Sequence, residues 1–190
     1  MHDLQPFNAL GGRVPHRADI GTVTLCEMPN VALASVTARC GTEAACKEAL
    51  SKWLGADVPG PGKATLGTPY DALWLGPDQW MICAPFDTHE DLAERFKSDL
   101  GQSASVTEQS DAWVCLDLIG PSSGADAVME RLCALDIRTM GLGDATRTTI
   151  DHLGCLVVRR APIDGLRIIG PRSSAGSLFH SIKTAMRSAL

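Results

Sequence analysis

One short motif occurs twice in this chain and limits the folds that the chain can adopt. Ile119-Gly120-Pro121-Ser122 and Ile169-Gly170-Pro171-Arg172-Ser173 each follow a strand-like apolar run and precede an amphipathic helical stretch. Proline suits the start of a helix and cannot continue a central strand, so each motif predicts a strand-to-helix corner. Two such corners indicate that the second half of the chain mixes strands with helices.

The remaining pattern extends this mixture over the whole chain. Apolar and β-branched runs predict strands at residues 23–28, 31–40, 71–75, 79–84, 104–108, 112–119, 146–150, 153–159 and 165–169. Helical spacing of apolar residues predicts helices at residues 42–54, at 87–100, after Pro121 and at the C-terminal end. Residues 31–108 then have the order β-α-β-β-α-β of a ferredoxin-like unit, and residues 112–190 have the order β-α-β-β-β-α.

The expected architecture is therefore α+β, with two fused ferredoxin-like sheet-and-helix halves. Residues 1–21 contain Gly11-Gly12 and no sustained periodicity, which predicts an extended N-terminal arm. The first half is expected at 22–110 and the second at 111–190, packed tightly enough to count either as two domains or as one. Pro29-Asn30 and Gly76-Pro77-Asp78 each predict the turn of a β-hairpin.

Charge and composition exclude several classes of partner and site. The 190 residues include 17 Lys and Arg against 22 Asp and Glu, a net charge of −5, which argues against a nucleic-acid-binding role. No apolar run is long enough to cross a membrane, so we expect a cytoplasmic protein with no membrane partner. Seven cysteines without a C-x-x-C or clustered Cys/His spacing predict free thiols and no metal site.

The sequence carries no recognisable catalytic or cofactor-binding motif. It has no G-x-S-x-G nucleophile elbow, no phosphate-binding loop and no dinucleotide fingerprint between a strand and a helix. Asp151-His152 is the one tempting acid–base pair, but neighbours on a strand point to opposite faces. We therefore predict no catalytic, cofactor-binding or metal-binding residue in this chain.

Tryptophan and arginine supply the candidate partner interface, which consists of Trp74, Asp78, Trp80 and Arg172. Trp74 and Trp80 flank the predicted turn, and tryptophan is enriched at protein interfaces. The alternative for both rings is packing in the core. Arg172, at the second corner, either pairs with an acidic residue of a partner or binds backbone carbonyls.

Three segments resemble a known family when taken in order. They are Trp74-Leu75-Gly76-Pro77-Asp78-Gln79-Trp80-Met81-Ile82, the segment Ser110-Asp111-Ala112-Trp113-Val114-Cys115-Leu116-Asp117-Leu118-Ile119-Gly120-Pro121, and the ending Ile169-Gly170-Pro171-Arg172-Ser173-Ser174-Ala175-Gly176. This set resembles the gamma subunits of heterotetrameric sarcosine oxidases. The resemblance implies a fold related to the folate-binding aminomethyltransferase superfamily.

The resemblance also implies a function. It suggests a non-catalytic, architectural subunit of a complex that oxidatively demethylates sarcosine to glycine, with tetrahydrofolate as one-carbon acceptor. The expected partners are the alpha subunit with NAD and the tetrahydrofolate site, the beta subunit with the flavins, and the delta subunit with zinc. This chain is expected to carry no cofactor itself.

Two other functions stay open at the level of sequence. In the first, the chain is a folate-binding module related to aminomethyltransferases, with Arg172 on the glutamate tail of the ligand. In the second, it is a stand-alone transferase that uses Asp144 or Asp117 as base. The second alternative lacks a visible group that would orient the base.

Overall fold

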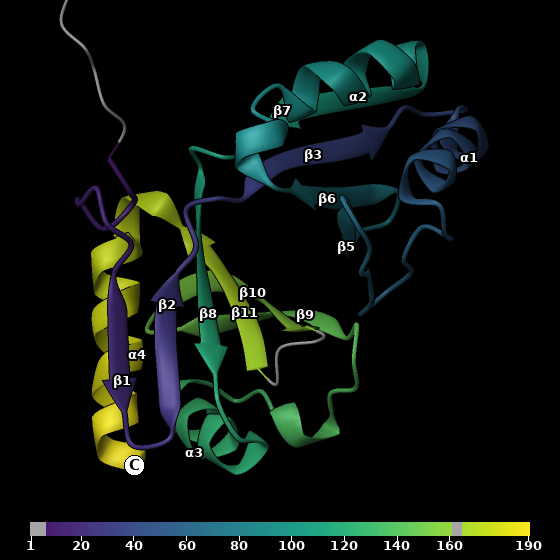
Figure 1. The fold of residues 1–190 in the computed structure, drawn as a ribbon. Helices are drawn as coiled ribbons and strands as arrows, with labels where there is room; N and C mark the ends of the chain where they lie inside the picture. The colour runs from purple at the N-terminus through teal and green to yellow at the C-terminus, as the bar shows by residue number, and fades with distance from the viewer. Residues whose placement is uncertain (1–6, 161–164) are drawn as a thin grey trace, which may run out of the picture. The chain divides into compact units, whose positions relative to one another are not determined.

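The computed structural model describes residues 7–160 and 165–190, which form two compact units. The described residues of the first unit are those up to Pro29, together with Ala112–Gly141 and those within Arg147–Leu190. The second unit comprises Asn30–Asp111 and Leu142–Thr146. Each unit has a sheet and two helices of its own (Figure 1), as expected for an α+β chain.

The second unit is a five-stranded antiparallel sheet with two helices. Its elements are β3 (Ala32–Ala38), α1 (Glu43–Leu54), β4 (Ala64–Thr65), β5 (Asp71–Gly76), β6 (Gln79–Ala84), α2 (Leu92–Leu100) and β7 (Ala104–Glu108). The strand order is β4-β5-β6-β3-β7, and all its pairs are antiparallel. Without the short β4 this is the ferredoxin-like arrangement that the sequence predicts, because β3 lies between β6 and β7.

Alternation along the strands builds the core of the second unit. Ala32, Ala34 and Val36 of β3 are buried on the same face as Trp80 and Ile82 of β6. The two helices add larger apolar side chains to this cluster, namely Leu50, Leu92, Phe96 and Leu100. Small residues on the central strand leave room for these side chains, since a protein interior is packed without large voids.

The first unit is a six-stranded sheet with two helices. Its elements are β1 (Arg17–Ile20), β2 (Val23–Glu27), β8 (Trp113–Ile119), α3 (Ser122–Leu132), β9 (Ala145–Ile150), β10 (Leu153–Arg160), β11 (Gly165–Pro171) and α4 (Ala175–Ala189). The strand order is β1-β2-β8-β11-β10-β9. Apolar residues of α3 and α4 form one core with inward-facing residues of β2, β8, β10 and β11. Figure 1 shows α4, in yellow, running alongside β1 and β2.

Both predicted strand-to-helix corners are present. The first joins β8 to α3, and the second joins β11 to α4 through a short 3-10 turn, Arg172–Ser174. β8 and β11 are antiparallel neighbours, so the two corners lie at opposite ends of the sheet. At the first corner, a Cβ on Gly120 would lie 2.7 Å from the Thr22 carbonyl oxygen, which explains why glycine precedes the proline there.

The hairpin predicted at Pro29-Asn30 is wrong. β2 pairs with β1 and β8, whereas β3 pairs with β6 and β7 in the other sheet. An apolar run predicts a strand but not its partner, and here the turn residues lie where the chain passes from one unit to the other.

The expected domain boundaries change for the same reason. Residues 17–20 form the edge strand β1, so residues 1–21 are not simply an extended arm. Residues 22–29 do not belong with 30–110, and residues 142–146, which include the first two residues of β9, are grouped with the second unit. The unit to which each of these segments belongs depends on its pairing with strands far away in the sequence. Local periodicity does not reveal such pairing.

No helix among the described residues is long and apolar enough to cross a membrane.

Candidate functional site

The β5–β6 hairpin carries three of the four predicted interface residues. Its register places Trp74 directly opposite Trp80, so both rings project from the same face of the sheet. Trp80 is only 2% exposed, and its Nε1 donates to the Pro59 carbonyl at 3.0 Å. Trp80 is therefore a core residue, and its prediction as an exposed docking residue is wrong. Trp74 is half-buried and keeps part of its surface.

Asp78 is held inside the second unit by its backbone and its carboxylate. It follows Pro77 in the hairpin turn with φ of 55°, and its carbonyl accepts from the Ala38 amide at 3.0 Å. Lys47 Nζ of α1 lies 2.6 Å from the Asp78 carboxylate and 5.9 Å from the centroid of the Trp80 ring. The hydrogen bond to Asp78 raises the pKa of Lys47. The Asp78 carboxylate is therefore already paired with a cation of the same chain, Lys47.

Arg172 lies in the first unit, whereas the other three predicted residues lie in the second. Its Nη2 donates to the Phe7 carbonyl at 3.0 Å, and its backbone amide donates to the Ala112 carbonyl at 2.9 Å. The sequence predicts two roles for Arg172, pairing with an acidic residue of a partner or binding backbone carbonyls. In the structure its guanidinium binds a backbone carbonyl. The side chain is half-buried at the corner before α4.

The two aspartates considered as bases are both engaged by cations. Asp117 accepts two hydrogen bonds from Arg167, at 2.7 and 2.8 Å, and both side chains are buried. Asp144 lies 2.5 Å from Lys63 Nζ. Pairing of this kind is typical of a structural carboxylate, so neither residue has the environment expected for a general base.

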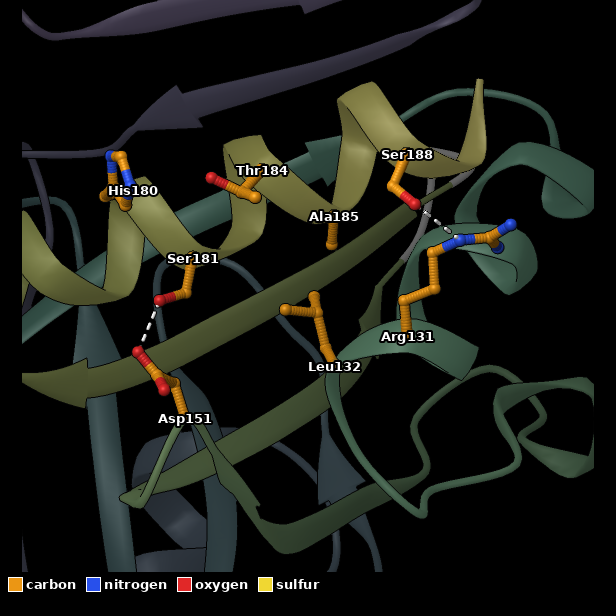
Figure 2. A pocket seen from close by; sticks show the side chains of 8 residues that line it. All are labelled: Arg131, Leu132, Asp151, His180, Ser181, Thr184, Ala185 and Ser188. Carbon is orange, nitrogen blue, oxygen red and sulfur yellow. Dashed lines mark hydrogen bonds between the residues drawn. The ribbon is translucent and has the colours of Figure 1, made fainter.

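A pocket of about 410 Å³ lies on the first unit between the end of α3, the face of α4 and the turn that joins β9 to β10. Figure 2 shows Asp151 at one end and Arg131 at the other, with Leu132 and Ala185 between them. Ser181 Oγ donates to Asp151 Oδ2 at 2.5 Å. At the opposite end, Arg131 Nε donates to Ser188 Oγ at 3.3 Å.

Local backbone geometry explains the position of Asp151. Asp151 and His152 form the two-residue turn between β9 and β10, with φ of 47° and 67°. Positive φ at both central residues is the conformation of a type I′ hairpin turn, in which Asp is tolerated. The pair therefore lies on a turn and not on a strand, and His152 does not line the pocket.

The pocket has charged ends, but its serine is not paired with a histidine as in a catalytic triad. Ser181 donates directly to the Asp151 carboxylate, whereas a catalytic serine donates to a histidine. His180 projects from α4 on the side away from the Ser181–Asp151 contact (Figure 2). The arrangement is suited to binding charged groups at two separate points. Sequence reasoning missed it, since its residues come from three separate segments, and the one signal is the two-turn spacing of Ser181 and Ser188.

The seven cysteines are distributed over both units. None of the seven cysteines forms a disulfide, and burial raises the pKa values of the Cys115 and Cys155 thiols to about 11. Thiols with such pKa values are protonated at neutral pH and react slowly as nucleophiles. Within residues 7–160 and 165–190, no group of three or more His, Cys, Asp or Glu side chains is placed to hold a metal ion.

Comparison with solved structures identifies two informative neighbours. One is heterotetrameric sarcosine oxidase from Corynebacterium sp. U-96, in complex with pyrrole 2-carboxylate, with 26% sequence identity and a TM-score of 0.75. The match covers 90% of this chain and 87% of the other. This chain resembles a sarcosine oxidase chain.

The second neighbour is the glycine cleavage system aminomethyltransferase T from Bartonella henselae. It has a TM-score of 0.65 and 17% identity over 86% of this chain, and the match covers 46% of that protein. This likeness concerns the fold, and it confirms the predicted aminomethyltransferase-like α+β architecture. No protein-family model matches the chain, and no curated protein matches it.

Proposed function

We propose that this chain is a non-catalytic, architectural subunit of a sarcosine oxidase complex, corresponding to the gamma subunit. One observation carries the proposal, namely the match to a heterotetrameric sarcosine oxidase with a TM-score of 0.75 over nine-tenths of this chain. The ordered motifs around Trp74–Ile82, Ser110–Pro121 and Ile169–Gly176 support the same family independently of the coordinates.

The proposal includes the composition of the complex. The alpha, beta and delta subunits are its partners, and NAD, tetrahydrofolate, flavin and zinc are bound by those partners. The paired states of Asp117 and Asp144 agree with an architectural role for this chain, because a general base needs a carboxylate that is available to substrate. Of the hairpin residues predicted to face a partner, the half-buried Trp74 remains the candidate.

The test is co-expression with the alpha, beta and delta subunits encoded by the same genome. With an affinity tag on the beta subunit, this chain should be captured in stoichiometric amount together with sarcosine-dependent peroxide formation. The chain purified alone should show no flavin absorbance and form no peroxide from sarcosine. Turnover by the pure chain, or a complete active complex that excludes it, would overturn the proposal.

The folate-binding alternative is tested with the same preparation. If this chain held a folate by itself, calorimetric titration of the free chain with tetrahydrofolate would show saturable binding, and Arg172→Gln would weaken it. The architectural proposal expects no such binding. Arg172 already donates to the Phe7 carbonyl, so a folate tail would have to compete with that contact.

A further inference from the structure

The pocket on the first unit has opposite charges at its two ends. The Asp151 carboxylate accepts one hydrogen bond, from Ser181, through Oδ2. Arg131 donates Nε to Ser188 and Nη1 to the Ala127 carbonyl, so its guanidinium marks the positively charged end of the pocket. A serine contact links each charged group to α4.

The spacing of the two ends follows from the helix. Ser181 and Ser188 lie on the same face of α4, two turns apart, which separates the charged ends by about 10 Å along the helix axis. Ala185 lies between them on that face, and the half-buried Leu132 of α3 lies beside it (Figure 2). A ligand that uses both ends must therefore be long, with an apolar middle.

We infer that this pocket binds an extended segment of a partner protein. The segment carries a lysine or arginine opposite Asp151, an apolar side chain over Leu132 and Ala185, and a carboxylate opposite Arg131. Three residues of extended chain cover about 10 Å, which matches the distance between the ends. The ammonium and carboxylate of a free α-amino acid are attached to the same carbon, so such a molecule cannot reach both ends.

Electrostatic complementarity also sets the direction of the bound segment. Its cation must face the β9–β10 turn and its anion the end of α3, and the reverse order would place like charges together at both ends. The inference rests on the proposed function in one respect only, because it takes the segment to belong to a partner subunit of the complex.

The direct test is titration of the ¹⁵N-labelled full chain with two tetrapeptides of the same composition, followed by NMR. The first, acetyl-Lys-Ala-Leu-Glu-amide, has its charges three residues apart, and the second, acetyl-Lys-Glu-Ala-Leu-amide, has them adjacent. We expect saturable shifts at the amides of Arg131, Asp151, Ser181 and Ser188. The first peptide should bind about fivefold more tightly than the second, since only it can engage both ends.

Variants of the chain make the test specific. Arg131→Gln and Asp151→Asn should each weaken the first peptide about fivefold, as expected for loss of one exposed charged contact. Arg187→Gln, on α4 but outside the pocket, is the control for loss of an exposed arginine and should bind like the wild type. Equal affinity for the two peptides, shifts centred elsewhere, or variants that bind like the wild type would each overturn the inference.

A second test separates this inference from the proposed function. Arg131→Glu should be captured by the tagged complex several-fold less than the wild-type chain. If the wild type is not captured, the proposed function fails. If the wild type and Arg131→Glu are captured equally, only the assignment of this pocket to a partner segment is wrong.

Discussion

Arg167 Nε and Nη2 donate to the two carboxylate oxygens of Asp117 at 2.7 and 2.8 Å, across directly opposed positions of β11 and β8. Asp117 alternates along β8 with the core residues Leu116 and Leu118, so this ion pair lies on the sheet face opposite α3 and α4. A shift of one residue in strand register would separate two buried charges. The pair therefore favours this one register of β8 against β11.

Removal of one member of this pair should destabilise the protein strongly. Asp117→Ala removes two charge-assisted hydrogen bonds from the buried Arg167 guanidinium, which we expect to cost about 3–5 kcal/mol of unfolding free energy. Urea unfolding measures this loss. The double variant Asp117→Leu with Arg167→Leu should lose less stability than the sum of the losses in Asp117→Leu and Arg167→Leu alone, and an additive result would contradict the coupling.

Trp80→Ala should destabilise the fold and not merely a docking surface. The ring is buried among Ala34, Ile82 and their neighbours, so its removal leaves a cavity that we expect to cost about 3–5 kcal/mol. Trp80→Phe keeps most of the ring and loses the hydrogen bond to Pro59, at about 1 kcal/mol. Trp74→Ala is the control at a half-buried position. Thermal unfolding should show that it loses less stability than Trp80→Ala.

The left-handed backbone at Asp78 predicts a difference between two small replacements. Asp78→Ala and Asp78→Gly both remove the ion pair with Lys47, so the loss of that pair cancels when the two are compared. Alanine at φ of 55° is strained, whereas glycine is not, so Asp78→Gly should be about 1 kcal/mol more stable. Equal denaturation midpoints for the two variants would show that the turn relaxes to another conformation.

The buried thiols predict a loss of stability in alkaline solution. Burial raises the pKa values of Cys115 and Cys155 from the ordinary 9.0 to about 11. Between pH 9 and 11 the unfolded chain loses these protons while the folded chain keeps them, so the unfolding free energy falls as pH rises. The limit is about 1.4 kcal/mol per pH unit for each thiol.

Urea unfolding at several pH values between 8 and 11 checks this expectation. Cys115→Ala and Cys155→Ala should each reduce the slope of stability against pH, whatever their effect at pH 8. Cys40→Ala, at an exposed thiol, is the matched control. If neither core variant changes the slope, the alkaline loss has another origin.

Local sequence was sufficient wherever short-range geometry decides the structure. Gly-Pro corners end β8 and β11 because proline cannot continue a central strand, and Pro77-Asp78 closes the β5–β6 hairpin by turn chemistry alone. The same local motifs carried the resemblance to sarcosine oxidase, which the structural comparison supports. The ferredoxin-like order of the second unit followed from the succession of strands and helices.

Tertiary structure decided what depends on residues far apart in the chain. β2 has the pattern of any half-buried strand, and only its register with β8 placed it in the first unit. Trp80 became a core residue through packing against helices that its own neighbours do not specify. The hydrogen bonds from Arg167 to Asp117 and from Ser181 to Asp151 join residues that are far apart in the sequence. Periodicity reports which face of an element is apolar, whereas the partner of that face is set by long-range contacts that form only when the chain folds.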